Sequence, residues 1–131
     1  MKQKNNKGYT GIDVAVAVMI LMIFISTISA LFYNLSYASK RLERKAIATN
    51  MAVNVIEAMK IRGYSNLTVS NNLSLSDIGL KMSIPNGYKI KKISVEDYKN
   101  LNKIKIISVE IGYTLKSNEQ SIKIETLVRN V

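Results

Sequence analysis

The chain has 131 residues, enough for one compact domain and an anchoring segment, and its formal net charge is +10. It contains neither cysteine nor histidine, which excludes disulfides, thiol nucleophiles and Cys- or His-based metal sites and removes the commonest general base. The nine acidic residues are scattered, and Glu96-Asp97 is the only adjacent pair; neighbours on a strand point to opposite faces. We therefore predict no enzymatic activity, no catalytic residue, no cofactor and no metal.

The N-terminal part of the sequence contains an uninterrupted apolar run. Val14 to Tyr33 comprises 20 residues without charge, proline or glycine. About 20 apolar residues suffice for a helix to cross the ~30 Å hydrocarbon layer of a membrane. A basic tail, residues 1–7, precedes the run, and Asp13 stands at its start. Because a carboxylate at the edge of a membrane helix is costly, we expect a membrane span in which Asp13 has a partner.

The residues that join the basic tail to the apolar run read KGYTGID. This junction resembles the leader of type IV prepilins and type II secretion pseudopilins, with Gly11 where Leu is common and Asp13 where Glu is usual. The resemblance implies a leader peptide, residues 1–8, that a prepilin peptidase removes by cleaving between Gly8 and Tyr9. It also implies N-methylation of Tyr9. Asp13, the fifth mature residue, would then neutralise a terminal amine during filament assembly.

Two other interpretations of the N-terminal segment remain open. In the first, residues 1–7 and Val14–Ile25 are the basic and apolar regions of a secretory signal peptide, with a cleavage site within Ser26–Ala30. The position of Asp13 and the continuation of the run to Tyr33 argue against a signal peptide. In the second interpretation, the segment is the plain single-pass anchor of a surface protein.

The orientation of the span follows from the resemblance and not from the flanking charge. Three lysines precede the run, and four basic residues with one acid, Glu43, follow it within residues 40–45. The positive-inside rule alone does not favour a cytoplasmic N-terminus. We predict that orientation because the leader implies a cleavage site on the cytoplasmic side. The expected location is the plasma membrane, followed by an extracytoplasmic filament.

From residue 36 to 63 the chain is amphipathic, and it lacks glycine and proline from Ile12 to Arg62. The predicted apolar stripe comprises Leu35, Leu42, Ala46, Val53, Ile56 and Met59. Gly63 follows Lys60 and Arg62 and is a typical C-cap. We therefore predict one helix over residues 10–62, with a membrane and assembly half (9–35) and an amphipathic half (36–63). The alternative is a break near residues 34–36. Residues 48–60 also resemble, weakly, the corresponding segment of minor pilins.

The rest of the sequence predicts a loop and a small sheet. Residues 64–79 are rich in Ser and Asn and form the αβ-loop, with Leu67 and Ile78 among the apolar residues available to pin it. Alternation of apolar and polar residues predicts an antiparallel sheet over residues 80–131.

The expected strand segments are 80–85, the part from Tyr88 onward, Lys103–Leu115 and Ser121–Val131, and residues 116–120 are the expected hairpin loop. A bulge is expected near Lys91-Lys92, because Tyr88 and Ile90 alternate out of phase with Ile93 and Val95. The predicted fold class is α+β: a long N-terminal helix packed against an antiparallel β-meander of three or four strands. One face should cover the Met51–Met59 part of the helix and the other should be rich in lysine.

The expected function is that of a structural subunit, a minor pilin or pseudopilin, whose partners are a prepilin peptidase, other pilin subunits and membrane lipid. Lysines crowd the sheet, with Tyr88, Tyr98 and Tyr113 among them: Lys89, Lys91, Lys92, Lys99, Lys103, Lys105, Lys116 and Lys123. A basic, aromatic surface leaves open a competence-type pilin head that binds nucleic acid. Lysine alternating with isoleucine is, however, also the ordinary pattern of a sheet with one solvated face.

Overall fold

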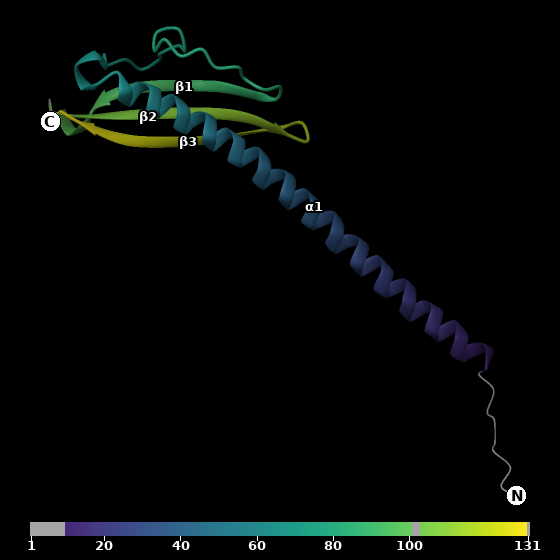
Figure 1. Cartoon of the computed structure of the whole chain (residues 1–131). Helices are drawn as coiled ribbons and strands as arrows, with labels where there is room; N and C mark the ends of the chain where they lie inside the picture. The colour runs from purple at the N-terminus through teal and green to yellow at the C-terminus, as the bar shows by residue number, and fades with distance from the viewer. Residues whose placement is uncertain (1–9, 101–102, 131) are drawn as a thin grey trace, which may run out of the picture. The chain divides into compact units, whose positions relative to one another are not determined.

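A computed structural model describes residues 10–100 and 103–130. Its elements are α1 (Gly11–Ile61), the short 3-10 helices η1 (Tyr64–Asn66) and η2 (Tyr98–Asn100), and strands β1 (Tyr88–Asp97), β2 (Ile104–Leu115) and β3 (Asn118–Arg129). The fold class is α+β, as predicted, with a three-stranded antiparallel sheet in the order β1-β2-β3 (Figure 1). The chain divides into two compact units, Met1–Lys40 and Arg41–Val131, which are described separately.

Helix α1 is a single helix of 51 residues, and the alternative of a break near residues 34–36 is wrong. Beyond its C-terminal end, Gly63 has a left-handed φ of 79°, and its N–H donates to the carbonyl oxygen of Lys60 at 3.0 Å. Glycine adopts this conformation without the steric cost that a Cβ would bring. Gly63 therefore ends the helix, as its position behind Lys60 and Arg62 predicts.

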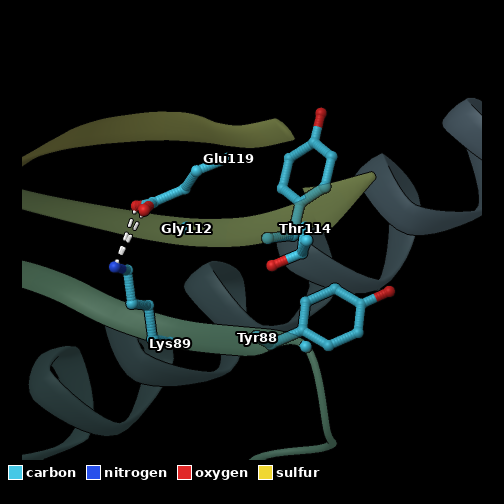
Figure 2. A pocket seen from close by; sticks show the side chains of 7 residues that line it. Tyr88, Lys89, Gly112, Thr114 and Glu119 are labelled. Carbon is cyan, nitrogen blue, oxygen red and sulfur yellow. Dashed lines mark hydrogen bonds and ion pairs between the residues drawn. The ribbon is translucent and has the colours of Figure 1, made fainter. Parts of the chain in front are cut away.

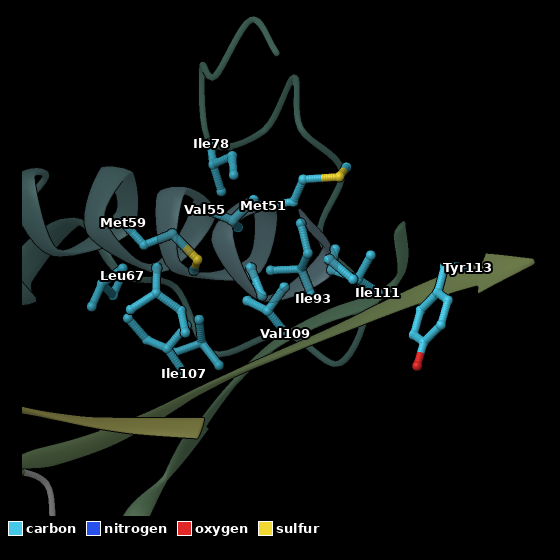
Figure 3. Close-up of a cluster of buried hydrophobic side chains, with 14 residues drawn as sticks. Met51, Val55, Met59, Leu67, Ile78, Ile93, Ile107, Val109, Ile111 and Tyr113 are labelled. Atoms are coloured by element: carbon cyan, nitrogen blue, oxygen red, sulfur yellow. The ribbon is translucent and has the colours of Figure 1, made fainter. Parts of the chain in front are cut away.

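In the second unit, one face of α1 packs on one face of the sheet (Figure 3). The helix contributes six buried residues at spacings of three and four: Ala48, Met51, Ala52, Val55, Ile56 and Met59. The sheet contributes Ile93, Val95, Ile107, Val109 and Ile111, all fully buried. The predicted contact between the sheet and the Met51–Met59 part of the helix is confirmed.

The predicted apolar stripe of the helix was partly wrong. Leu42 and Val53 are 68% and 36% exposed, whereas Ala48, Ala52 and Val55 are fully buried. Two apolar lines run side by side along this part of the helix, and periodicity alone does not choose between them. The line through Ala48, Ala52 and Val55 faces the sheet.

The predicted bulge in β1 is confirmed, since the register with β2 shifts between Ile90 and Lys92. An extra residue at this point returns the side chains of Ile93 and Val95 to the same face as those of Tyr88 and Ile90. The resulting cross-strand pairs on the core face are Tyr88↔Tyr113, Ile90↔Ile111, Ile93↔Val109 and Val95↔Ile107. The bulge thus reconciles the two phases of the sequence pattern with a single buried face.

The sheet begins later than the alternation predicts. Residues 80–85 form no strand, and the first strand starts at Tyr88. Pro85 has no N–H to give to a ladder, which disfavours a strand at that position. Leu80 and Met82 instead pack against the core from an irregular segment.

The connection between β2 and β3 is also tighter than predicted. It is a two-residue turn, Lys116-Ser117, in which both residues have positive φ (46° and 68°). This geometry matches the twist of the flanking strands, but it normally selects Asn or Gly, so the sequence carries no signal for it. Residues 118–120, expected in the loop, therefore belong to β3.

The segment after α1 runs along the outer edge of β1. Ser70 and Val95 exchange two backbone hydrogen bonds of 3.0 and 2.8 Å, and the N–H of Leu73 donates to the carbonyl oxygen of Ile93 at 2.9 Å. Leu67 and Ile78 are buried in the core, as predicted for residues that pin this loop. The loop therefore covers part of one edge of the sheet.

Candidate functional site

Asp13 and Thr10 form a reciprocal cap at the N-terminal end of α1. Asp13 Oδ2 accepts hydrogen bonds from the backbone N–H of Thr10 at 3.0 Å and from its hydroxyl at 2.8 Å. The N–H of Asp13 donates to Thr10 Oγ1 at 3.4 Å. This is a capping box, in which two side chains satisfy backbone groups that a helix end leaves unpaired. The spacing Thr-x-x-Asp is the sequence signal that predicts it. Gly8 and Tyr9, the predicted processing residues, lie outside the described residues.

The helical surface that follows Asp13 is apolar and exposed. Side chains throughout Val14–Tyr33 are accessible, with Met19 and Phe32 exposed by 66% and 68%. The hydroxyls of Ser26 and Thr27 each donate to the carbonyl oxygen of Ile23 at 2.8 Å, so these polar groups are satisfied within the helix. The helix is long and apolar enough to span a membrane, and none of its most apolar 18-residue stretch is buried. This surface suits lipid or other apolar helices.

The outer face of the sheet carries the expected lysines, but acidic side chains lie among them. The strand registers place on it five basic residues (Lys89, Lys91, Lys92, Lys123 and Arg129) and four acidic residues (Glu96, Glu110, Glu119 and Glu125). Lys89 and Lys91 both pair with Glu119, at 3.0 and 2.7 Å, and Lys123 pairs with Glu125 at 2.6 Å. Sequence reasoning noted the lysines and overlooked the acids that alternate with them.

These ion pairs shift the titration of their members. The hydrogen bond to Glu119 raises the pKa of Lys91 above its ordinary value, and hydrogen bonds from Lys91 and Lys89 lower the pKa of Glu119. In the second pair, the contact raises the pKa of Lys123 and lowers the pKa of Glu125. Mutual neutralisation reduces the attraction of this face for phosphate groups. Nucleic-acid binding therefore stays a hypothesis without support from this face.

Two of the lysines predicted for a binding surface contact aromatic rings instead. Lys105 is half-buried, and its Nζ donates to the carbonyl oxygen of Leu67 and lies 4.4 Å from the centre of the Tyr64 ring. Lys99 Nζ lies 5.2 Å from the ring of Tyr98. Lys105 thus holds the segment after α1 against the sheet, a structural role that the alternating sequence pattern does not reveal.

A small cavity of about 220 Å³ opens where β1 and β2 meet the turn at Gly87 (Figure 2). Its lining comprises Gly87, Tyr88, Lys89, Gly112, Tyr113, Thr114 and Glu119. The centres of the Tyr88 and Tyr113 rings lie 6.4 Å apart. The guanidinium of Arg44 lies 5.4 Å from the centre of the Tyr88 ring. Within the described residues, the buried hydroxyl of Tyr88 has no hydrogen-bond partner. The cavity is smaller than ordinary ligand pockets, and we assign it no ligand.

The described part of the chain contains no group of three acidic side chains placed to hold a metal ion. No protein-family model matches the sequence, and no curated protein and no solved structure matches it significantly. The functional interpretation therefore depends on the junction KGYTGID, on the capped start of α1 and on the apolar surface behind it.

Proposed function

We propose that this protein is a structural subunit of a pilus-like filament, a minor pilin or pseudopilin that is inserted into the plasma membrane, processed and assembled. The observation that carries the proposal is one continuous helix, α1, that is apolar and exposed over Val14–Tyr33 and buries a face against a small sheet beyond residue 47. One element thus combines a membrane-compatible surface with a folded head. The processing step is inferred from the resemblance of residues 7–13 to a prepilin leader.

In this proposal, residues 1–8 are a cytoplasmic leader, and a membrane peptidase hydrolyses the bond between Gly8 and Tyr9. The new α-amine of Tyr9 becomes N-methylated. Tyr9 is four residues before Asp13 in the sequence. An ammonium and a carboxylate in a low-dielectric environment attract each other strongly. Asp13 Oδ1 accepts neither of the two bonds from Thr10, which Oδ2 accepts. Asp13 would therefore cap its own helix and pair with a Tyr9 amine.

The proposal also explains the flanking charge. Basic residues lie on both sides of the apolar run, with three lysines in residues 1–7. Cleavage after Gly8 removes these three lysines and leaves the four basic residues of the segment 40–45. The charge of the precursor therefore differs from that of the mature chain, and the three lysines contribute to a cytoplasmic N-terminus only until processing.

The mature N-terminus tests the proposal. The full chain is produced in cells with and without a prepilin peptidase, extracted from the membrane, and analysed by intact mass and N-terminal peptide mass spectrometry. We expect a chain that begins with N-methyl-Tyr9 only where the peptidase is present, and a full-length chain for Gly8→Leu. A full-length wild-type chain in peptidase-containing cells would refute the proposal. A start near Leu31 would establish a signal peptide instead.

A further inference from the structure

Strand β3 offers a long and regular edge. It has 12 residues, contains no proline, and pairs with β2 without any register shift from Asn118 to Arg129. In the described structure β3 is an outer strand of the sheet, whereas the opposite edge is partly covered by the Ser70–Val95 bridge. A straight outer strand of this length is a template for pairing with another strand.

The hairpin turn determines which backbone groups face this open edge. In a two-residue hairpin the flanking residues, here Leu115 and Asn118, form a hydrogen-bonded pair. The even-numbered residues of β3 then direct their backbone groups toward β2. The odd-numbered residues, from Glu119 to Arg129, direct theirs outward, so the edge presents N–H and C=O groups at every second residue.

The side chains of these outward residues have a self-complementary charge pattern. On the outer face β3 presents Glu119, Ser121, Lys123, Glu125, Leu127 and Arg129. If two copies of β3 pair antiparallel about a two-fold axis at Ile124, Lys123 meets Glu125 of the second copy. In the same register Glu119 meets Arg129 of the second copy. Each contact occurs twice, so four opposite-charge pairs form.

The neighbouring registers lack this complementarity. Centring the pair on Lys123 or on Glu125 places that residue opposite itself, a like-charge contact. Centring it on Ile122 opposes Glu119 to Glu125 of the second copy, and centring it on Thr126 opposes Lys123 to Arg129. Pairings that oppose an odd-numbered residue of one copy to an even-numbered residue of the other would place polar side chains of the outer face opposite apolar side chains of the core face. Charge therefore selects the register centred on Ile124.

The opposite face of β3 is compatible with this register. Ile122, Ile124 and Val128 are only partly buried although they pack against the core. In the Ile124-centred pair, Ile124 contacts its own copy and Ile122 lies opposite Thr126, which covers apolar surface that a single copy leaves accessible. The existing pairs of Lys123 and Glu119 are half-exposed and contribute little by themselves, so both residues remain able to bind a second partner.

We propose that β3 pairs antiparallel with β3 of a second copy of this chain, in the register centred on Ile124, and joins two sheets into one of six strands. The two-fold axis is perpendicular to the sheet, so the segments Arg41–Ile61 of the two copies run in opposite directions. This inference is independent of the proposed function and goes beyond it.

Disulfide trapping tests the pairing, because the natural chain has no cysteine. In a non-hydrogen-bonded antiparallel pair the Cα atoms lie about 4.5 Å apart, within the range that a disulfide spans. We expect Ile124→Cys to form covalent dimers in the detergent-solubilised full chain under mild oxidation. Val128→Cys is the matched control. It lies on the same face of the same strand, but its copies would be about 25 Å apart in this register, and it should remain monomeric.

Charge exchange in the Ile124→Cys background tests the register. With Lys123→Glu, positions 123 and 125 oppose two glutamates at both symmetry-related contacts. This like-charge contact should slow cross-linking about fivefold. Adding Glu125→Lys restores opposite charges and should restore the rate. Far-UV circular dichroism verifies that each variant is folded. Equal cross-linking of the Ile124 and Val128 cysteine variants, or a double exchange as slow as the single one, would overturn the proposal.

Discussion

Gly112 shows how one residue arranges the charges of the outer sheet face. A Cβ at this position would lie 2.9 Å from Lys91 Cε and 3.2 Å from Lys89 Cγ. Both lysine side chains therefore cross the strand over Gly112 to reach Glu119 on β3. Figure 2 shows the contact between Lys89 and Glu119. The missing side chain makes room for this bridge between the outer strands, and only the register of the sheet reveals it.

We predict that Gly112→Ala loosens this bridge without unfolding the sheet, since flexible lysine side chains can move away from the added methyl group. The pKa of Glu119, lowered in the native protein, should rise toward its ordinary value of 4.5, and that of Lys91 should fall toward 10.5. Titration of the Glu119 carboxyl group by NMR measures the first change. An unaltered pKa of Glu119 in the variant would contradict the interpretation.

The same pair sets the sign of a pH dependence. Because the pKa of Glu119 is lower in the folded chain than in the unfolded chain, the ion pair stabilises the folded state at pH values above the unfolded-state pKa. This contribution is lost as the pH falls through the folded-state pKa of Glu119. A raised lysine pKa stabilises below 10.5 and loses its contribution as pH rises through the folded value. The small contribution of this exposed pair to stability should therefore decline at both extremes of pH, and Gly112→Ala should reduce both declines.

At the scale of elements, the contact between α1 and β2 supports the head. Ile107 is fully buried between the helix and the sheet, whereas Leu127, on the opposite face of the neighbouring strand, is 56% exposed. We predict that Ile107→Ala lowers the free energy of unfolding by about 2–5 kcal/mol. The matched variant Leu127→Ala should cost less than about 0.5 kcal/mol. Urea unfolding of the detergent-solubilised chain, followed by tyrosine fluorescence, measures both. Similar losses would mean that the buried face is assigned wrongly.

Several elements follow from local sequence alone. Helix α1 was predictable from a stretch without glycine or proline that ends at Gly63, and the bulge in β1 from the phase change between Ile90 and Ile93. The tight turn at Lys116-Ser117 was not predictable, because neither residue normally favours positive φ. Pairing of twelve residues in each flanking strand imposes that conformation on the turn. Tertiary pairing thus overrides a local preference.

At the scale of the whole molecule, filament assembly can distinguish two roles of Asp13, as the cap of its own helix and as the counter-ion of the Tyr9 amine. Thr10→Ala removes the hydroxyl of the capping box and keeps the carboxylate, whereas Asp13→Ala removes the carboxylate. We predict that Asp13→Ala leaves the chain inserted and cleaved but blocks its incorporation into filaments, because the Tyr9 amine loses its counter-ion. Thr10→Ala should incorporate nearly normally. Immunoblotting of sheared filaments measures incorporation. Equal defects would indicate that Asp13 acts only as a helix cap.

The sequence by itself determined the membrane-compatible run, the single long helix, the α+β class and the candidate site at Asp13, because these depend on local composition and spacing. It also carried the Thr10–Asp13 capping pattern, whose two residues are three positions apart. Only the tertiary structure decided which line of the helix is buried, how the lysines and glutamates pair, and which edge of the sheet stays open. Those properties depend on strand register, which brings residues 30 positions apart, such as Lys89 and Glu119, into contact.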